Sequence, residues 1–246
     1  MIERKIPPRD GTIGGILQCG FISIISCEQI LLKDHTMTYK VRGYIIRKKD
    51  SRESDKIFTL YTEELGKIRV VAQGVKKISS KLCGNLELLH QATYTIASGK
   101  QMDRIVTVDI IDTYEPIKND MKKLICALYF FDFLDHLIKD SQQDSQVYGL
   151  IGEMLDSLAV CSSVQAPLIA DVFLLKFRMV SGYGTSKHSQ EILSLFSEKQ
   201  LSEIVVHIRA EDIKKIHTLA RAFISEYAEK ELKAQVFFDF FTHAEA

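Results

Sequence analysis

The sequence predicts an α+β protein in which a small five-stranded barrel precedes an all-α domain. Apolar residues recur with a period near two between residues 38 and 115, which is typical of half-buried strands. After Pro116 the period changes to that of amphipathic helices. We therefore expect the 246 residues to form three regions: an N-terminal extension (1–36), a barrel domain (37–115) and a helical domain (116–246).

The first region lacks the pattern of the other two. An apolar stretch over residues 12–32 follows three basic residues, which faintly resembles a signal peptide. Glu28 interrupts the stretch, and no clean cleavage site follows it. We expect residues 1–36 to be a disordered extension, or upstream sequence read in frame before a natural start at Met37.

Five strand candidates fit a small closed barrel of antiparallel strands. The third is the clearest, because basic residues at Lys67 and Arg69 alternate with apolar ones, which gives one charged and one apolar face. A polar segment around residues 50–55 separates the first two candidates. The candidates span residues 39–48, 56–62, 67–73, 89–97 and 102–114.

Basic residues in the barrel region indicate a nucleic-acid surface. Residues 37–84 contain 12 basic and 5 acidic residues, whereas residues 85–246 contain 16 basic and 23 acidic ones. Most charge runs are only a solvated sheet face, but this excess has one sign and is interleaved with aromatic residues. Phe58 shares strand parity with Leu60, so we expect it in the core. The residues expected to bind nucleic acid are Arg42, Arg47, Lys48, Lys49, Arg52, Lys56, Lys67, Arg69, Lys76, Lys77 and Lys81.

The second half predicts a helical bundle. The first helix, over residues 124–138, is apolar almost all round and should be central. Pro167 suits the first turn of the third helix. We expect the aromatic tail 236–241 to pack against the bundle or to offer a partner surface. The other candidates span residues 147–158, 167–179, 192–196 and 211–227.

Motifs of common enzyme classes are absent from the sequence. It has no P-loop, no His-Glu-x-x-His and no Gly-x-Ser-x-Gly, so we expect no catalytic residue and no cofactor. We expect His90 and His136 to be hydrogen-bonded core residues, and Asp132 and Asp135 to form a solvated edge.

Cysteine spacing and hydropathy exclude two further classes. The five cysteines form no Cys-x-x-Cys pair, so we expect free thiols in a reducing cytosol and no zinc site. The sequence contains no uninterrupted run of 18 apolar residues, so it predicts no membrane span. The cysteines are Cys19, Cys27, Cys83, Cys126 and Cys161.

Three short motifs follow one another between Tyr39 and Leu86. They are Glu53-Ser54-Asp55-Lys56, then Thr62 with Gly66, then Gly74, Lys76, Lys77, Ser80, Leu82, Gly84 and Leu86. Their order and spacing resemble the start of the bacterial recombination mediator RecO family. Gly182-Tyr183 and residues 227–238 are weaker matches to the family's helical half.

The resemblance implies an OB-fold barrel and a helical domain that bind single- and double-stranded DNA, anneal complementary strands and assist recombinase loading in the RecF pathway of DNA repair. It implies a cytoplasmic, nucleoid-associated protein whose partners are RecR and the acidic C-terminal tail of the single-strand-binding protein. Many family members carry a four-Cys zinc site, but no Cys follows Cys161 here, so residues 184–190 should be metal-free. The residues expected to bind the tail are Phe173, Lys176, Phe177 and Arg178.

Two alternatives stay open at this point. The chain fits an OB-fold RNA-binding module with a helical interaction domain, and it also fits an enzyme with an unrecognised helical active site, for which no positive signal exists. Acceleration of the annealing of protein-coated complementary DNA strands would separate the mediator from the RNA-binding module.

Overall fold

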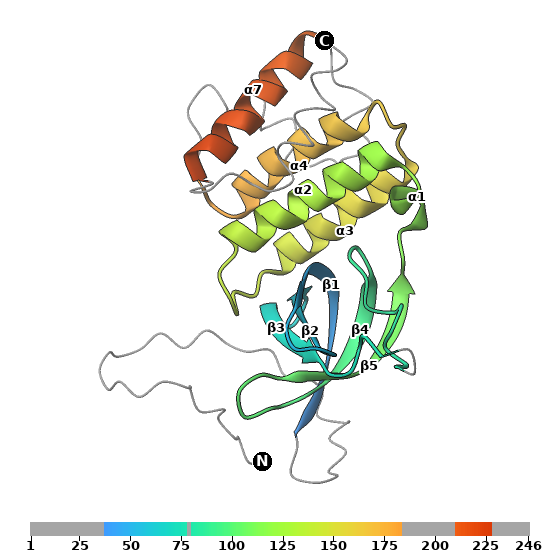
Figure 1. Ribbon diagram of the computed structural model, residues 1–246. Helices are drawn as coiled ribbons and strands as arrows, with labels where there is room; N and C mark the ends of the chain where they lie inside the picture. Colours follow the sequence, from blue (N-terminus) through green and yellow to red (C-terminus); the bar gives the residue numbers. More distant parts are fainter. Residues whose placement is uncertain (1–36, 78–79, 184–209, 228–246) are drawn as a thin grey trace, which may run out of the picture. The chain divides into compact units, whose positions relative to one another are not determined.

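Five strands and five helices make up the part of the chain that the computed structural model describes, residues 37–77, 80–183 and 210–227 (Figure 1). The strands come first and the helices follow, so the predicted α+β class with an N-terminal five-stranded OB-fold barrel is confirmed. The predictions for residues 1–36, 184–190, 192–196 and 236–241 fall outside the described residues.

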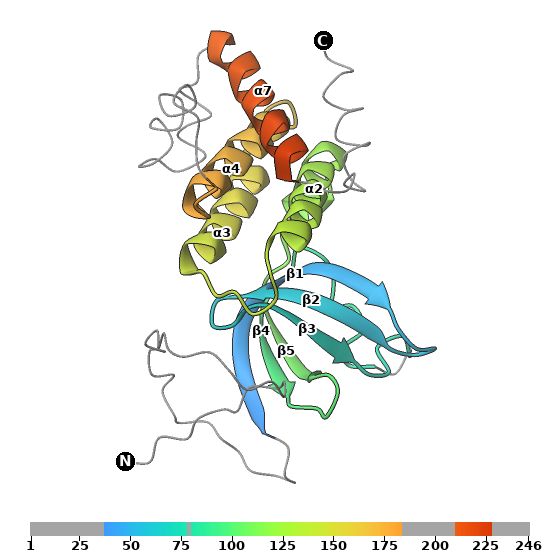
Figure 2. The same ribbon diagram turned by 90° about the vertical axis from the view of Figure 1, so that its left-hand side faces the viewer.

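The strands close into a barrel in the order β1-β2-β3-β5-β4 (Figure 2). Neighbouring strands are antiparallel except β3 and β5, which run parallel where Val71 lies opposite Arg104. Between Ile45 and Arg47 the register of β1 shifts by one residue, a bulge that bends the strand. The strands are β1 (Thr38–Asp50), β2 (Lys56–Thr62), β3 (Gly66–Ala72), β4 (Gln91–Ala97) and β5 (Arg104–Asp112).

Alternate residues of each strand fill the barrel. Phe58 and Leu60 of β2 are fully buried and lie in one cluster with Val70 of β3, as the strand parity predicts. The side chains between them therefore point out of the barrel. This outward face carries the candidate site.

Two of the helices, α2 (Met121–Leu137) and α3 (Ser145–Val160), begin where an aspartate side chain caps them. Asp120 accepts hydrogen bonds from the backbone N–H groups of Lys122 and Lys123, and Asp144 caps α3 in the same way. A proline stands in the first turn of α1 and of α4, and the short α1 was not predicted. The helices are α1 (Glu115–Lys118), α2 (Met121–Leu137), α3 (Ser145–Val160), α4 (Ala166–Val180) and α7 (Ala210–Tyr227).

Aromatic rings of α2, α4 and α7 form the centre of the helical core. The rings of Phe130 and Phe173 are 4.5 Å apart, and Phe133 packs edge-on against both Phe177 and Phe223. The cluster does not stop at the helices: Tyr44 and Tyr61 of the barrel belong to the same buried group. Barrel and helices therefore share apolar core packing rather than only a linker.

The turn between β2 and β3 is fixed by its Thr-x-x-x-Gly motif. The Thr62 hydroxyl accepts a hydrogen bond from Leu65 N and donates one to Gly66 O. Gly66 has a φ of 66°, and a Cβ there would lie 2.0 Å from the backbone oxygen of Gln142. The motif thus lets the loop after α2 approach the barrel closely.

Replacing Gly66 by Ala is expected to lower the free energy of unfolding by about 2–3 kcal/mol, because backbone strain adds to a clash with the loop. Gly84 is the matched control, since its φ is 87° but a Cβ would meet nothing within 4 Å. Gly84→Ala should lower it by only about 1 kcal/mol. Equal losses in urea denaturation would show that the close approach at Gly66 does not matter.

Candidate nucleic-acid interface

The outward face of the barrel carries three rows of side chains that cross from strand to strand. Strand register places each residue of a row beside the next, and all of them point away from the barrel core. We name the rows by their surroundings: covered, border and open. The covered row is Tyr44, Tyr61 and Lys67; the border row is Arg47, Thr59 and Arg69; the open row is Lys49, Ile57, Val71 and Arg104.

Helix residues pack on the covered row. The rings of Tyr44 and Tyr148 are 5.2 Å apart, and Tyr61 donates a hydrogen bond to the backbone oxygen of Asp144 at 3.3 Å. Burial raises the pKa of both phenols, so they stay neutral. Because Tyr44 and Tyr61 are buried in this way, they are not available to stack on bases.

Lys67 also lies in the covered row, and the prediction that it is exposed beside Arg69 is wrong. Its exposed fraction is 4%. The ammonium group donates to the backbone oxygen of Asp135 at 2.6 Å, and the carboxylates of Asp135 and Asp140 lie 3.5 and 3.7 Å away. The alternation of β3 holds, but the end of α2 and the loop after it cover this half of the strand.

Carboxylates of the helical domain line the border row. Asp135 near the end of α2 pairs with Arg47, and Asp140 pairs with Arg69 at 3.1 Å. The side chain of Asp135 is only 7% exposed, so the prediction that it belongs to a solvated edge is wrong. Both arginines stay about half exposed at this boundary.

The open row is free of such partners. Lys49 and Arg104 are exposed, and neither makes an ion pair with any residue in the described ranges. Between them lie Ile57 and Val71, both half-buried. Sequence reasoning missed Arg104, because only the parallel pairing of β5 with β3 brings it to this face.

Two turns beside the open row carry further cations. Asp55 of the Glu-Ser-Asp-Lys motif accepts a hydrogen bond from Gly74 N at 2.8 Å, which ties the turn after β1 to the turn after β3. Ser54 O accepts a second bond from Lys76 N at 3.1 Å. The tied turns present Arg52 and Lys77, which are exposed and make no ion pair within the described part of the chain.

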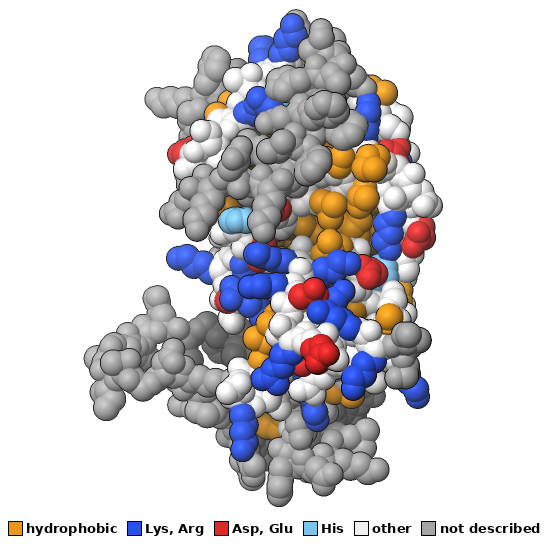
Figure 3. All heavy atoms as spheres, in the orientation of Figure 1, with side chains coloured by type: hydrophobic (Ala, Val, Ile, Leu, Met, Phe, Trp, Pro, Cys, Tyr) orange, Lys and Arg blue, Asp and Glu red, His pale blue; other side chains and the backbone are white. Residues whose placement is uncertain are grey.

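We call Lys49, Arg52, Lys77 and Arg104 the open basic surface. Lys56 begins β2 with the same strand parity as the buried Phe58 and Leu60, so it does not belong to this outward face. Lysine and arginine side chains gather over the barrel in the view of Figure 3. Lys81 is exposed in the loop before β4, and among the described residues it too has no ion pair. Three other predicted residues pair with acids: Arg42 with Glu63, Lys48 with Glu87 and Lys76 with Asp50.

The four residues predicted to bind a partner do not form an apolar ridge. Phe173 and Phe177 are 0% and 1% exposed and belong to the helical core. Lys176 contacts both carboxylate oxygens of Glu153 at 2.8 Å. The Arg178 guanidinium lies 5.2 Å from the ring centre of Phe223 and pairs with Glu226. Because the rings of Phe173 and Phe177 are buried, the expectation that they bind the tail is wrong.

The two histidines singled out by the sequence differ. His90 is buried, with Asn85 O and Lys118 Nζ at its two ring nitrogens, so the prediction of a core histidine is confirmed. His136 is exposed and contacts Asp132 O, so for it the prediction is wrong. In the described ranges, no three His, Cys, Asp or Glu side chains are grouped so that they could hold a metal ion.

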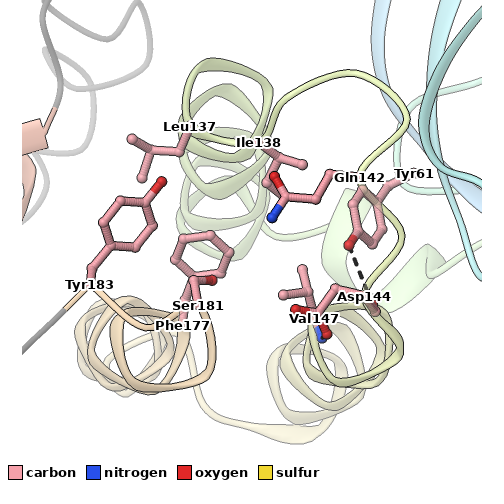
Figure 4. Close-up of a pocket in the computed structure, with 9 residues that line it drawn as sticks. All are labelled: Tyr61, Leu137, Ile138, Gln142, Asp144, Val147, Phe177, Ser181 and Tyr183. Atoms are coloured by element: carbon pink, nitrogen blue, oxygen red, sulfur yellow. Dashed lines mark hydrogen bonds between the residues drawn. The ribbon is translucent and has the colours of Figure 1, made fainter. Parts of the chain in front are cut away.

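A small pocket lies where α2, α3 and α4 meet the barrel (Figure 4). Its volume of 40 Å³ is far below the several hundred Å³ of a typical ligand site. Tyr61 and Asp144 lie on one side of it, joined by a hydrogen bond, and the ring of Phe177 lies toward the other side. We assign no ligand to this pocket. No helix in the described part of the chain is long and apolar enough to span a membrane.

The class of protein is thus an OB-fold barrel, basic on its open face, joined to a helical bundle. Residues 37–114 match the family described as "Recombination protein O N terminal", and residues 118–190 match "Recombination protein O C terminal". The chain belongs to this family, RecO, as the resemblance predicts.

Individual relatives agree. "DNA repair protein RecO" of Clostridium kluyveri is 30% identical over 151 residues, which are 61% of this chain and 58% of that protein. The protein of the same name from Listeria monocytogenes serovar 1/2a is 34% identical over 116 residues, 47% of this chain and 46% of its own. The matches span about half the length of these relatives.

Proposed function

We propose that this chain is a DNA repair and recombination mediator that binds single- and double-stranded DNA and anneals complementary strands. Family membership supports the repair role, because the relatives carry that name. The observation that carries the DNA-binding part is the open basic surface. It places four cations, none in an ion pair with a described residue, on connected parts of one barrel face.

The chemistry of this surface fits annealing. Two DNA strands repel each other through their phosphates, and a cationic surface lowers that repulsion. The open row contains no aromatic side chain, and the tyrosines of the covered row are buried. Contacts would therefore reach phosphates rather than bases, so that a bound strand keeps its bases free for pairing.

The proposal includes partners. A mediator of this kind assists recombinase loading in the RecF pathway together with RecR, on strands coated with single-strand-binding protein. The proposed cellular location is the nucleoid in the cytoplasm. The C-terminal tail of single-strand-binding protein remains a proposed ligand of the helical domain, but the buried Phe173 and Phe177 are not its anchors.

The function is tested by strand annealing with the full chain. Complementary DNA strands, bare or coated with single-strand-binding protein, are labelled as a fluorescence pair and mixed with and without the protein. The proposal expects faster annealing in both cases, and weaker acceleration as salt rises. Binding to RNA alone, without faster annealing of DNA, would refute the mediator and favour an RNA-binding module.

A further inference from the structure

An acidic side chain sits beside the proposed DNA surface and already occupies one of its arginines. Asp140 Oδ2 lies 3.1 Å from Nη2 of Arg69, and the two side chains are 50% and 56% exposed. The backbone holds Asp140 in place, because Lys67 and Asp140 form a parallel bridge and Ser141 N donates to Lys67 O at 2.8 Å. The carboxylate is therefore presented to the border row by the loop after α2.

The two border carboxylates differ in how easily they can leave their partners. Asp135 is 7% exposed and contacts Lys67, which is itself buried. Breaking this ion pair would therefore leave a buried charge without its partner. Arg69 and Asp140 both face solvent, where an ion pair is weak and screened by salt. If Arg69 moves to another anion, Asp140 still has Lys67 Nζ at 3.7 Å.

We propose that Asp140 is a built-in competitor of phosphate for Arg69, an inference that rests on the proposed function. In the free protein Asp140 neutralises Arg69. When a strand lies on the open basic surface, a phosphate displaces Asp140 and the contact extends from the open row to the border row. Asp140 remains next to Arg69 and repels the bound phosphate, which lowers the affinity for the strand.

Such a competitor suits a protein that must release a strand once it has annealed. Arg69 lies two residues before Val71 on β3, so it is the next outward position along the strand from the open row. A track that runs from Arg104 past Val71 reaches Arg69 without leaving this face. Arg47 is paired with the buried Asp135, so we expect that phosphate does not displace the carboxylate at Arg47.

The test compares four full-length chains: wild type, Asp140→Asn, Arg69→Ala and the double variant. Each is titrated with single-stranded DNA by fluorescence anisotropy at salt concentrations from about 50 to 200 mM. Asp140→Asn is expected to bind about two- to fivefold more tightly than wild type. Arg69→Ala loses one phosphate contact and should flatten the slope of log K against log salt by about 0.7. In the Arg69→Ala background, Asp140→Asn should have no effect.

Asp109→Asn is the matched control, because Asp109 is an exposed carboxylate of β5 with no ion pair to any described residue. It changes the net charge equally and should leave the affinity for single-stranded DNA unchanged. If wild type binds DNA and Asp140→Asn binds no more tightly, the proposal is overturned while the DNA-binding function stays intact. An equal gain in the Arg69→Ala background would also overturn it, since the effect would then be general charge. If neither wild type nor Asp140→Asn binds DNA, both proposals fall.

Discussion

Replacing Asp135 by Ala is expected to lower the free energy of unfolding by about 3–5 kcal/mol, the usual result of breaking a buried ion pair. The change leaves the ammonium group of Lys67, in a side chain only 4% exposed, without its nearer carboxylate. The remaining one, Asp140, is 3.7 Å away and half exposed. Arg47 loses its partner as well. Thermal unfolding of the full chain should show a Tm lower by about 10 °C.

Asp140 supplies the control for this prediction, because it belongs to the same ion-pair network but its side chain is half exposed to solvent. Asp140→Asn should change the free energy of unfolding by less than about 1 kcal/mol. A second variant, Lys67→Met with Asp135→Leu, replaces both buried charges by apolar groups and should recover most of the lost stability. If Asp135→Ala and Asp140→Asn unfold alike, the buried group does not hold barrel and helices together.

Removing four cations of the open basic surface together is expected to weaken binding to single-stranded DNA by about 100-fold or more at 50 mM salt. The variant carries Lys49→Ala, Arg52→Ala, Lys77→Ala and Arg104→Ala. Each lost phosphate contact should flatten the slope of log K against log salt by about 0.7. The loss should be the same for every DNA sequence, because phosphate contacts carry no base information. Stability should hardly change, since all four side chains are exposed.

Lys214 and Lys215 of α7 are the comparison, as both are exposed and lie far from the barrel strands in the chain. Changing both to Ala removes cations without touching the open basic surface, so the salt slope should stay that of wild type. A quadruple variant that binds like wild type would show that the DNA path lies elsewhere on the protein.

The barrel was largely predictable because strand alternation is a local property. Residues 56–62 were predicted as a strand, and β2 has the same bounds. Phe58 was placed in the core by parity alone, and it is fully buried. The short α1 was missed, since four residues show no periodicity.

The site was less predictable because it depends on what covers each face. The sequence shows that Lys67 and Arg69 share a face of the strand. It does not show that the helical domain covers Lys67 and leaves Arg69 at the edge of the covered region. Phe173 and Phe177 follow a helical apolar stripe, and only the packing of neighbouring helices decides whether such a stripe is core or surface. The position of Arg104 on this face follows only from the register between β3 and β5.

The central claim is that the open basic surface lies against the DNA backbone, and lysine footprinting tests it most directly. The full chain is acetylated briefly with and without single-stranded DNA, and the modified lysines are quantified by mass spectrometry. The account predicts that DNA protects Lys49 and Lys77, while Lys214 and Lys215 react as before. Protection of the α7 lysines, with these two barrel lysines unchanged, would contradict it.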